Sequence, residues 1–197
     1  MRTRMTVLFA AAVLATLAAG CSQQTTTDMT EPIATAATAY DALQAGDFST
    51  FVSYLHPEAV SEFENMVQPV LNALAPTDSL GNVVDSMNIF GTWRQSQAFM
   101  DQPADSIFVQ VMSAIFEIAP EIRMTFSSIE NDFVGGVMQA DTAFLVSRTT
   151  LTSQGQPFSE MNVVSMTKSD GEWKMQMPTQ IRGILDLAMR SLMQQRG

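Results

Sequence analysis

The chain has 197 residues and a mass of 21.5 kDa, with 10 basic against 20 acidic side chains, a net charge of −10 and a pI near 4.3. A hydrophobic share of 46% is enough for one domain with a buried core and excludes a wholly disordered protein. The acidic balance argues against a nucleic-acid partner, because phosphate binding needs clustered Lys and Arg. One Cys and one His exclude an internal disulfide and leave too few ligands for zinc, so we expect no metal and no cofactor.

The first 20 residues have the pattern of a secretory signal peptide. Arg2 and Arg4 precede an apolar run from Val7 to Leu17, and small residues follow the run. The run is much shorter than the roughly 20 residues that a membrane-spanning helix needs. The only cysteine of the chain, Cys21, comes directly after the small residues.

Residues 17–21, LAAGC, resemble the lipobox of bacterial lipoprotein precursors, in which a small residue precedes a cysteine that becomes lipidated. The resemblance implies that residues 1–20 are removed as a signal peptide and that Cys21 carries the lipid. Residues 21–30 hold almost no apolar side chains after the cysteine, so they are expected to form a flexible tether. The remaining residues, 31–197, are predicted to form a single domain.

Ser22 follows the cysteine where another class of lipoproteins has Asp, and this resembles the pattern of lipoproteins sent to the outer membrane. We therefore expect a cell-envelope protein that reaches its membrane through the lipid on Cys21. In a Gram-negative organism it would face the periplasm from the outer membrane. The alternative is a plain secreted protein with a chance cysteine at this position.

From residue 31 to about residue 120, apolar side chains recur every three or four residues, which predicts helices. Gly46 is a typical helix stop, and Asp47 is a typical cap for the next helix. Pro69 lies inside the third predicted helix, where it predicts a kink or an early end. The predicted helices are 32–45, 48–55, 57–74, 78–87 and 103–119.

Beyond residue 120 the apolar period changes to two, which predicts strands. Gly135-Gly136 indicates a bulge or a sharp bend, and Asp170-Gly171 indicates a two-residue hairpin. A last helix is predicted over residues 178–195, with a charge ladder on its outer side. The predicted strands are 124–139, 142–152, 158–168 and 172–177. The inward side chains of the last helix are expected to be Ile181, Ile184, Leu185, Ala188, Leu192 and Met193.

Helices followed by strands predict the α+β class, with N-terminal helices packed on a curved four-stranded antiparallel sheet and an extra C-terminal helix. Residues 39–48 (AYDALQAGDF) and 55–59 (LHPEA) resemble the opening of the nuclear transport factor 2-like cone fold. Residues 141–146 (DTAFLV) and 170–174 (DGEWK) resemble its closing hairpin. The resemblance covers about residues 33–177 and implies a pocket inside the cone.

Two features depart from that fold, namely an enlarged helical insert around residues 75–120 and the C-terminal helix. Either of them could fill the cone or cover its mouth. Members of the fold include isomerases, dehydratases and small-molecule binders, so the resemblance alone does not decide the function.

Three side chains are candidates for the wall of such a pocket. Tyr40 lies in the apolar stripe of the first helix, and it is either a core tyrosine or an oxyanion donor like that of steroid isomerases. Arg148 shares its strand face with Phe144 and Val146, and it is either an edge charge or a pocket cation for an acidic ligand. Trp173 is a core residue or a pocket wall.

The sequence contains no nucleophile-elbow, zinc-protease, P-loop or dinucleotide-binding motif. His56 precedes Pro57 at a helix junction, which favours a capping role over catalysis. Met175 and Met177 could suggest Cu(I) ligation, but their alternation along a strand favours core packing. We therefore expect no catalytic residues.

Three hypotheses follow. The first is a non-catalytic, lipid-anchored envelope domain that binds an apolar small molecule or a protein partner. The second is a small-molecule isomerase or hydratase, which rests only on the resemblance. The third is a purely structural envelope lipoprotein without a ligand.

Overall fold

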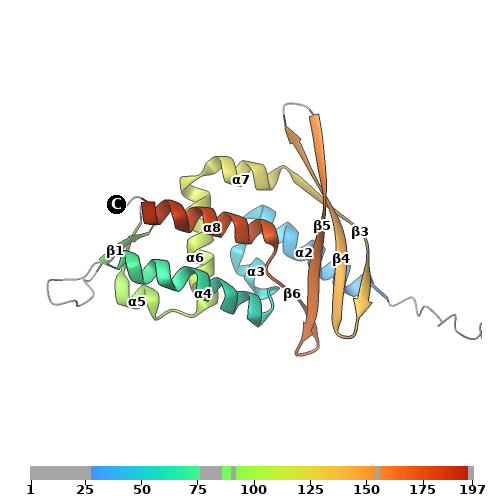
Figure 1. The fold of residues 1–197 in the computed structure, drawn as a ribbon, viewed down its shortest axis with the longest axis horizontal. Coiled ribbons are helices and arrows are strands. Elements are labelled where there is room, and N and C mark those ends of the chain that lie inside the picture. The colour runs from blue at the N-terminus through green and yellow to red at the C-terminus, as the bar shows by residue number, and fades with distance from the viewer. Residues whose placement is uncertain (1–27, 76–85, 90–91, 154–155, 195–197) are drawn as a thin grey trace, which may run out of the picture.

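The computed structural model describes residues 28–75, 86–89, 92–153 and 156–194 (Figure 1). Its helices are α2 (Thr30–Ala45), α3 (Phe48–Ser53), α4 (Pro57–Leu74), α5 (Ser96–Met100), α6 (Ala104–Ile118), α7 (Pro120–Ser127) and α8 (Thr179–Gln194). Its strands are β1 (Ser86–Ile89), β2 (Thr92–Gln95), β3 (Ile129–Gln139), β4 (Thr142–Ser153), β5 (Gln156–Ser169) and β6 (Glu172–Met175). The predicted signal peptide and Cys21 lie outside the described residues.

The predicted α+β class is confirmed. Strands β3, β4, β5 and β6 form a four-stranded antiparallel sheet in that order, and β1 and β2 form a separate hairpin. Helices α3 to α8 lie to one side of the sheet, whereas α2 runs across it toward β3 (Figure 1). The predicted irregularity at Gly135-Gly136 is present, because the register of β3 against β4 shifts between Phe133 and Gly135.

The junctions of the first three helices follow from local chemistry. Gly46 adopts the left-handed conformation with φ 75° and closes α2, because its N–H bonds back to the carbonyls of the last turn. The Asp47 carboxylate caps α3 by accepting from the Thr50 N–H, and hydrogen bonds from Thr50 and Ser49 lower the pKa of Asp47 to about 2. His56 caps α4 through Nδ1, which accepts from the Glu58 N–H at 3.2 Å.

Two of the predicted elements are wrong over part of their length. The end of the helix predicted over 78–87 is wrong, because Met87 lies in strand β1, and residues 78–85 of that prediction lie outside the described residues. The first residues of the strand predicted over 124–139 belong to α7, which Pro120 opens at its first turn. The burial of Phe126 against Phe116, with ring centroids 5.6 Å apart, holds these residues in a helix.

The last predicted helix is present as α8. Ile181 and Leu185 are buried as expected. The side chains of Leu192 and Met193, in the last turn of the helix, lie outside the described part of the structure. On the outer side, Arg190 pairs with Asp186 one turn away. Pro69 lies inside α4, which continues to Leu74, so the proline does not end the helix.

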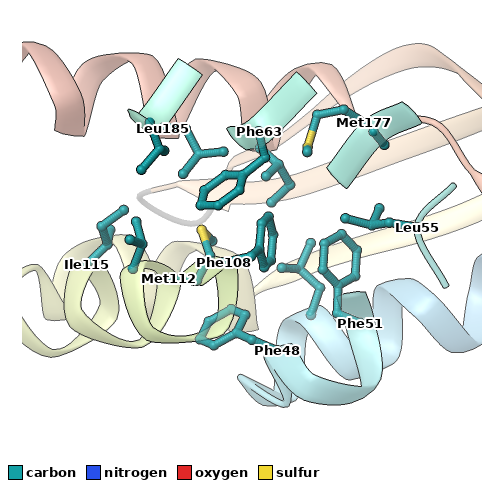
Figure 2. Packing of buried hydrophobic residues seen from close by; sticks show 14 of the residues in the cluster. Phe48, Phe51, Leu55, Phe63, Phe108, Met112, Ile115, Met177 and Leu185 are labelled. Atoms are coloured by element: carbon teal, nitrogen blue, oxygen red, sulfur yellow. The ribbon is translucent and has the colours of Figure 1, made fainter. Parts of the chain in front are cut away.

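The main core lies between the helices, where α3, α4, α6 and α8 meet (Figure 2). Phe108 of α6 is fully buried and lies 4.9 Å from Phe63 and 5.9 Å from Phe51, measured between ring centroids. Leu185 of α8 and Met177 close the same cluster from the C-terminal side (Figure 2). The C-terminal helix α8 therefore closes a filled interior. From the sequence, this helix is expected either to fill the cone or to cover its mouth.

Candidate functional site

The face of the sheet that the helices cover, here called the covered face, forms one wall of a pocket. The pocket lies between α2, α7, β3, β4 and the start of α8. Its open space amounts to about 20 Å³ for a water-sized molecule. A cavity of that size has room for about one water molecule. The lining residues are Tyr40, Leu43, Gln44, Phe126, Ile129, Asn131, Thr149, Pro178, Gln180 and Ile181.

Polar side chains on the sheet side of this pocket bond mainly to one another. Thr149 Oγ1 donates to Asn131 Oδ1 at 3.0 Å, and Asn162 Nδ2 donates to Thr149 Oγ1 at 3.3 Å. Gln44 Nε2 reaches across from α2 and donates to the Ile129 carbonyl at 2.7 Å. These bonds reduce the capacity of the groups to recognise a polar ligand and connect α2 to the first residue of β3.

Tyr40 is the one sequence-predicted candidate that lines this pocket. Its ring is 7% exposed and packs edge-on against Phe133, with the centroids 5.9 Å apart. Burial raises the pKa of Tyr40 to about 12, because the phenolate would lose its hydration. No carboxylate lines the pocket beside it, so the pair of groups that an isomerase of the cone type needs is not assembled there.

The raised pKa of Tyr40 predicts a particular alkaline behaviour. The unfolded side chain ionises near pH 10, so its contribution to stability is complete below that pH and is lost as pH rises toward about 12. Phenolate absorbance should show a tyrosine that ionises near pH 12 in the native protein, and Tyr40→Phe should remove that step. Ionisation of Tyr40 at the ordinary value in the folded protein would contradict its burial.

Trp173 lies on β6 and holds α2 in place. Its Nε1 donates to Glu31 Oε2 at 3.3 Å, and Lys168 Nζ lies 5.1 Å from the ring centroid. The side chain is buried and does not line the pocket at Tyr40. It therefore joins the closing strand to the first turn of the first described helix.

Arg148 lies on the opposite face of the sheet from the pocket. Its guanidinium pairs with Asp132 of the neighbouring strand β3 at 2.5 Å, and the side chain is 51% exposed. It shares this face with Phe144 and Val146, as the alternation of β4 predicts. The structure therefore does not bring Tyr40, Arg148 and Trp173 into one site.

The polar residues that do gather near Tyr40 were not singled out from the sequence. Gln44, Asn131, Thr149 and Gln180 come from α2, β3, β4 and α8. Residue spacing does not reveal that four separate elements meet at one place. The available signal is Asn131, a polar residue between the apolar Ile129 and Phe133 on the inward face of β3. Of these four residues, Asn131 and Thr149 are directly paired across neighbouring strands.

A second hollow lies between the end of α2, α3 and α6, and its open space is about 190 Å³. Arg123 and Glu117 are its charged lining residues, beside the apolar Phe48 and Phe116. The two charges are of opposite sign, and the hollow is open to solvent.

The described part of the chain contains no helix that is long and apolar enough to cross a membrane. Comparison with family models and with curated proteins gives no match. Among solved structures, the chain is similar to the 1.70 Å crystal structure of an NTF-2 like protein of unknown function from Shewanella oneidensis MR-1. The similarity has a TM-score of 0.40 and 12% sequence identity, and it covers 75% of this chain and 93% of that chain.

Proposed function

We propose that the protein is a lipid-anchored cell-envelope domain with a cone-like fold that carries out no catalysis itself and serves by binding a protein partner. The observation that carries the proposal is the filled interior where α3, α4, α6 and α8 meet. Phe63, Phe108 and Met112 occupy its centre, and each of them is fully buried. An enzyme of the isomerase or hydratase type needs a space for its substrate beside a buried acid or base.

The buried polar side chains of the described residues point in the same direction. They are Ser96 and Ser147, whose hydroxyls make no hydrogen bond within the described structure. A serine hydroxyl without a neighbouring base is a weak nucleophile and a weak acid. The chemistry available inside the fold therefore favours a binding role.

The anchor is supported by the sequence around Cys21, where a charged start, an apolar run and small residues precede the only cysteine. Lipid chains on this cysteine would hold the protein at a membrane, because each buried methylene contributes about 0.8 kcal/mol. The acidic charge of the domain would keep it soluble above an anionic lipid surface.

Radiolabelled palmitate tests the anchor directly. We expect the wild-type chain to incorporate label and to sediment with membranes, and Cys21→Ala to lose both properties. Ser22→Ala is the matched control, because it changes the adjacent residue and leaves the thiol in place. Equal labelling of the wild-type and Cys21→Ala chains would overturn the anchoring proposal.

A small-molecule ligand is the second candidate, because the Tyr40 side chain lines a pocket at the start of α8. The space there holds about one water molecule, so a larger ligand would have to displace Pro178 or Ile181. The isomerase or hydratase hypothesis would use this same place. Activity lost in Tyr40→Phe but kept in Tyr54→Phe would favour it.

A further inference from the structure

The outer face of the four-stranded sheet, opposite the helices, is apolar and uncovered within the described structure. Four of its side chains are among the most exposed large hydrophobic residues described, with Val137 at 65%, Val163 at 64%, Met161 at 57% and Val134 at 49%. We call this surface the outer sheet face; its apolar residues are Val134, Val137, Phe144, Val146, Met161 and Val163. A contiguous apolar surface of this kind marks an interaction site more often than chance exposure does.

Strand β4 carries large apolar side chains on both of its faces. Its covered face carries Ala143, Leu145 and Ser147, all buried, and its outer face carries the half-buried Phe144 and Val146. A strand with one face in water normally places polar side chains on that face. Phe144 and Val146 therefore predict that the outer sheet face is covered in the functional state.

The charge distribution restricts what can cover it. The described helices carry nine acidic and three basic side chains, whereas the outer face of strands β3 to β5 carries Glu130, Asp132 and Arg148. Because Arg148 pairs with Asp132, this face is nearly neutral in a strongly acidic protein. An anionic surface would therefore repel the helical side and tolerate the outer sheet face.

The start of the described chain lies at one edge of the same sheet. Met29 precedes α2 and packs against the covered face of the edge strand β3, where its Cε lies 2.7 Å from the position that a Cβ on Gly136 would take. Val137, the next residue of β3, points to the opposite side and is the most exposed large apolar side chain of the outer sheet face. Eight residue steps separate Cys21 from Met29, and they span at most about 28 Å when fully extended.

We propose that the outer sheet face rests on the lipid surface to which Cys21 anchors the chain. The inference rests on the proposed anchor, which makes the contact intramolecular, so a weak affinity of a few apolar side chains for lipid is sufficient. In this orientation the acidic helical layer points away from the membrane and toward the space where a protein partner would bind. The side chains of Val137, Met161 and Val163 would enter the headgroup region.

Single cysteines in the full chain test this arrangement, because the lipidated Cys21 would not react with a maleimide. Val137→Cys, Met161→Cys and Val163→Cys report on the outer sheet face. Leu187→Cys on α8 is the matched control, because Leu187 is 65% exposed, as much as Val163. Each chain is labelled with an environment-sensitive fluorophore and reconstituted into vesicles of phosphatidylethanolamine and phosphatidylglycerol, with or without a nitroxide on the acyl chains.

We expect a blue shift and nitroxide quenching at the three outer positions, and neither effect at Leu187→Cys. Fluorophores that remain in water at all positions would overturn the proposal. A blue shift without nitroxide quenching would also overturn it, because it would place a second copy of the chain or another protein on this face. Two controls report on the anchor alone: the chain floats with vesicles, and the chain with no added cysteine takes up no label. Failure of the anchor is therefore distinguishable from failure of the orientation.

Discussion

Replacing Phe108 with alanine is expected to lower the free energy of unfolding by about 3–5 kcal/mol, the largest effect of any change considered in this protein. Phe108 is fully buried on α6 and contacts the rings of Phe51 and Phe63 from α3 and α4 (Figure 2). Alanine would leave a cavity where three helices meet, and the surrounding rings could fill it only in part. Urea unfolding of the wild type and of Phe108→Ala measures the difference.

Phe158→Ala is the matched control for this substitution. Phe158 lies near the tip of the β4–β5 hairpin and is 66% exposed, so the same chemical change should alter stability by no more than about 0.5 kcal/mol. Similar losses for the two variants would show that Phe108 does not occupy a packed interior. Such a result would reopen the space between these helices as a ligand site.

Gly136→Ala is expected to destabilise the protein by about 1–3 kcal/mol, as overpacking does. A Cβ at this position would lie 2.6 Å from the carbonyl oxygen of Phe144 and 2.7 Å from Met29 Cε. The methionine can move, but the carbonyl belongs to the neighbouring strand and cannot. Thermal or urea unfolding measures the loss.

Gly183→Ala gives the opposite sign and serves as the control. Gly183 lies within α8, and a Cβ there would have no neighbour within 4 Å. Alanine at this position should therefore raise stability by about 0.5–1 kcal/mol through helix propensity alone. Destabilisation by both glycine substitutions would indicate that α8 or β3 is packed differently.

The elements that local signals define were predictable from the sequence. Asp170-Gly171 places the β5–β6 hairpin, and both residues adopt the positive φ angles that such a turn requires. Gly46 and Asp47 place the boundary between α2 and α3. Each of these signals acts within a few residues, so no knowledge of the tertiary structure is needed to interpret them.

The second half of α7, from Met124, is predicted from the sequence as the start of a strand, because tertiary packing decides its conformation. Met124 to Phe126 include residues that are common in strands, and their spacing agrees with either structure. Phe126 is buried against Phe116 at the α6–α7 junction, and only a helix begun at Pro120 brings the two rings together. Local propensity is too weak to compete with that contact.

The position of Arg148 illustrates a different limit. Alternation along β4 assigns Arg148 to one face with Phe144 and Val146, and the structure agrees. Alternation does not say which face the helices cover, because β4 carries Leu145 on the covered face and Phe144 and Val146 on the uncovered one. Hydrophobicity along this strand therefore does not decide between its two faces.

Native mass spectrometry of the full-length protein extracted from membranes tests the lipid anchor and the filled interior together. We expect a chain that begins at Cys21, carries covalent lipid and holds no small molecule that dissociates when the protein unfolds. A chain that retains residues 1–20, or a processed chain without lipid, would contradict the anchor. A small molecule released on unfolding would contradict the filled interior and would identify the protein as a small-molecule binder or an enzyme.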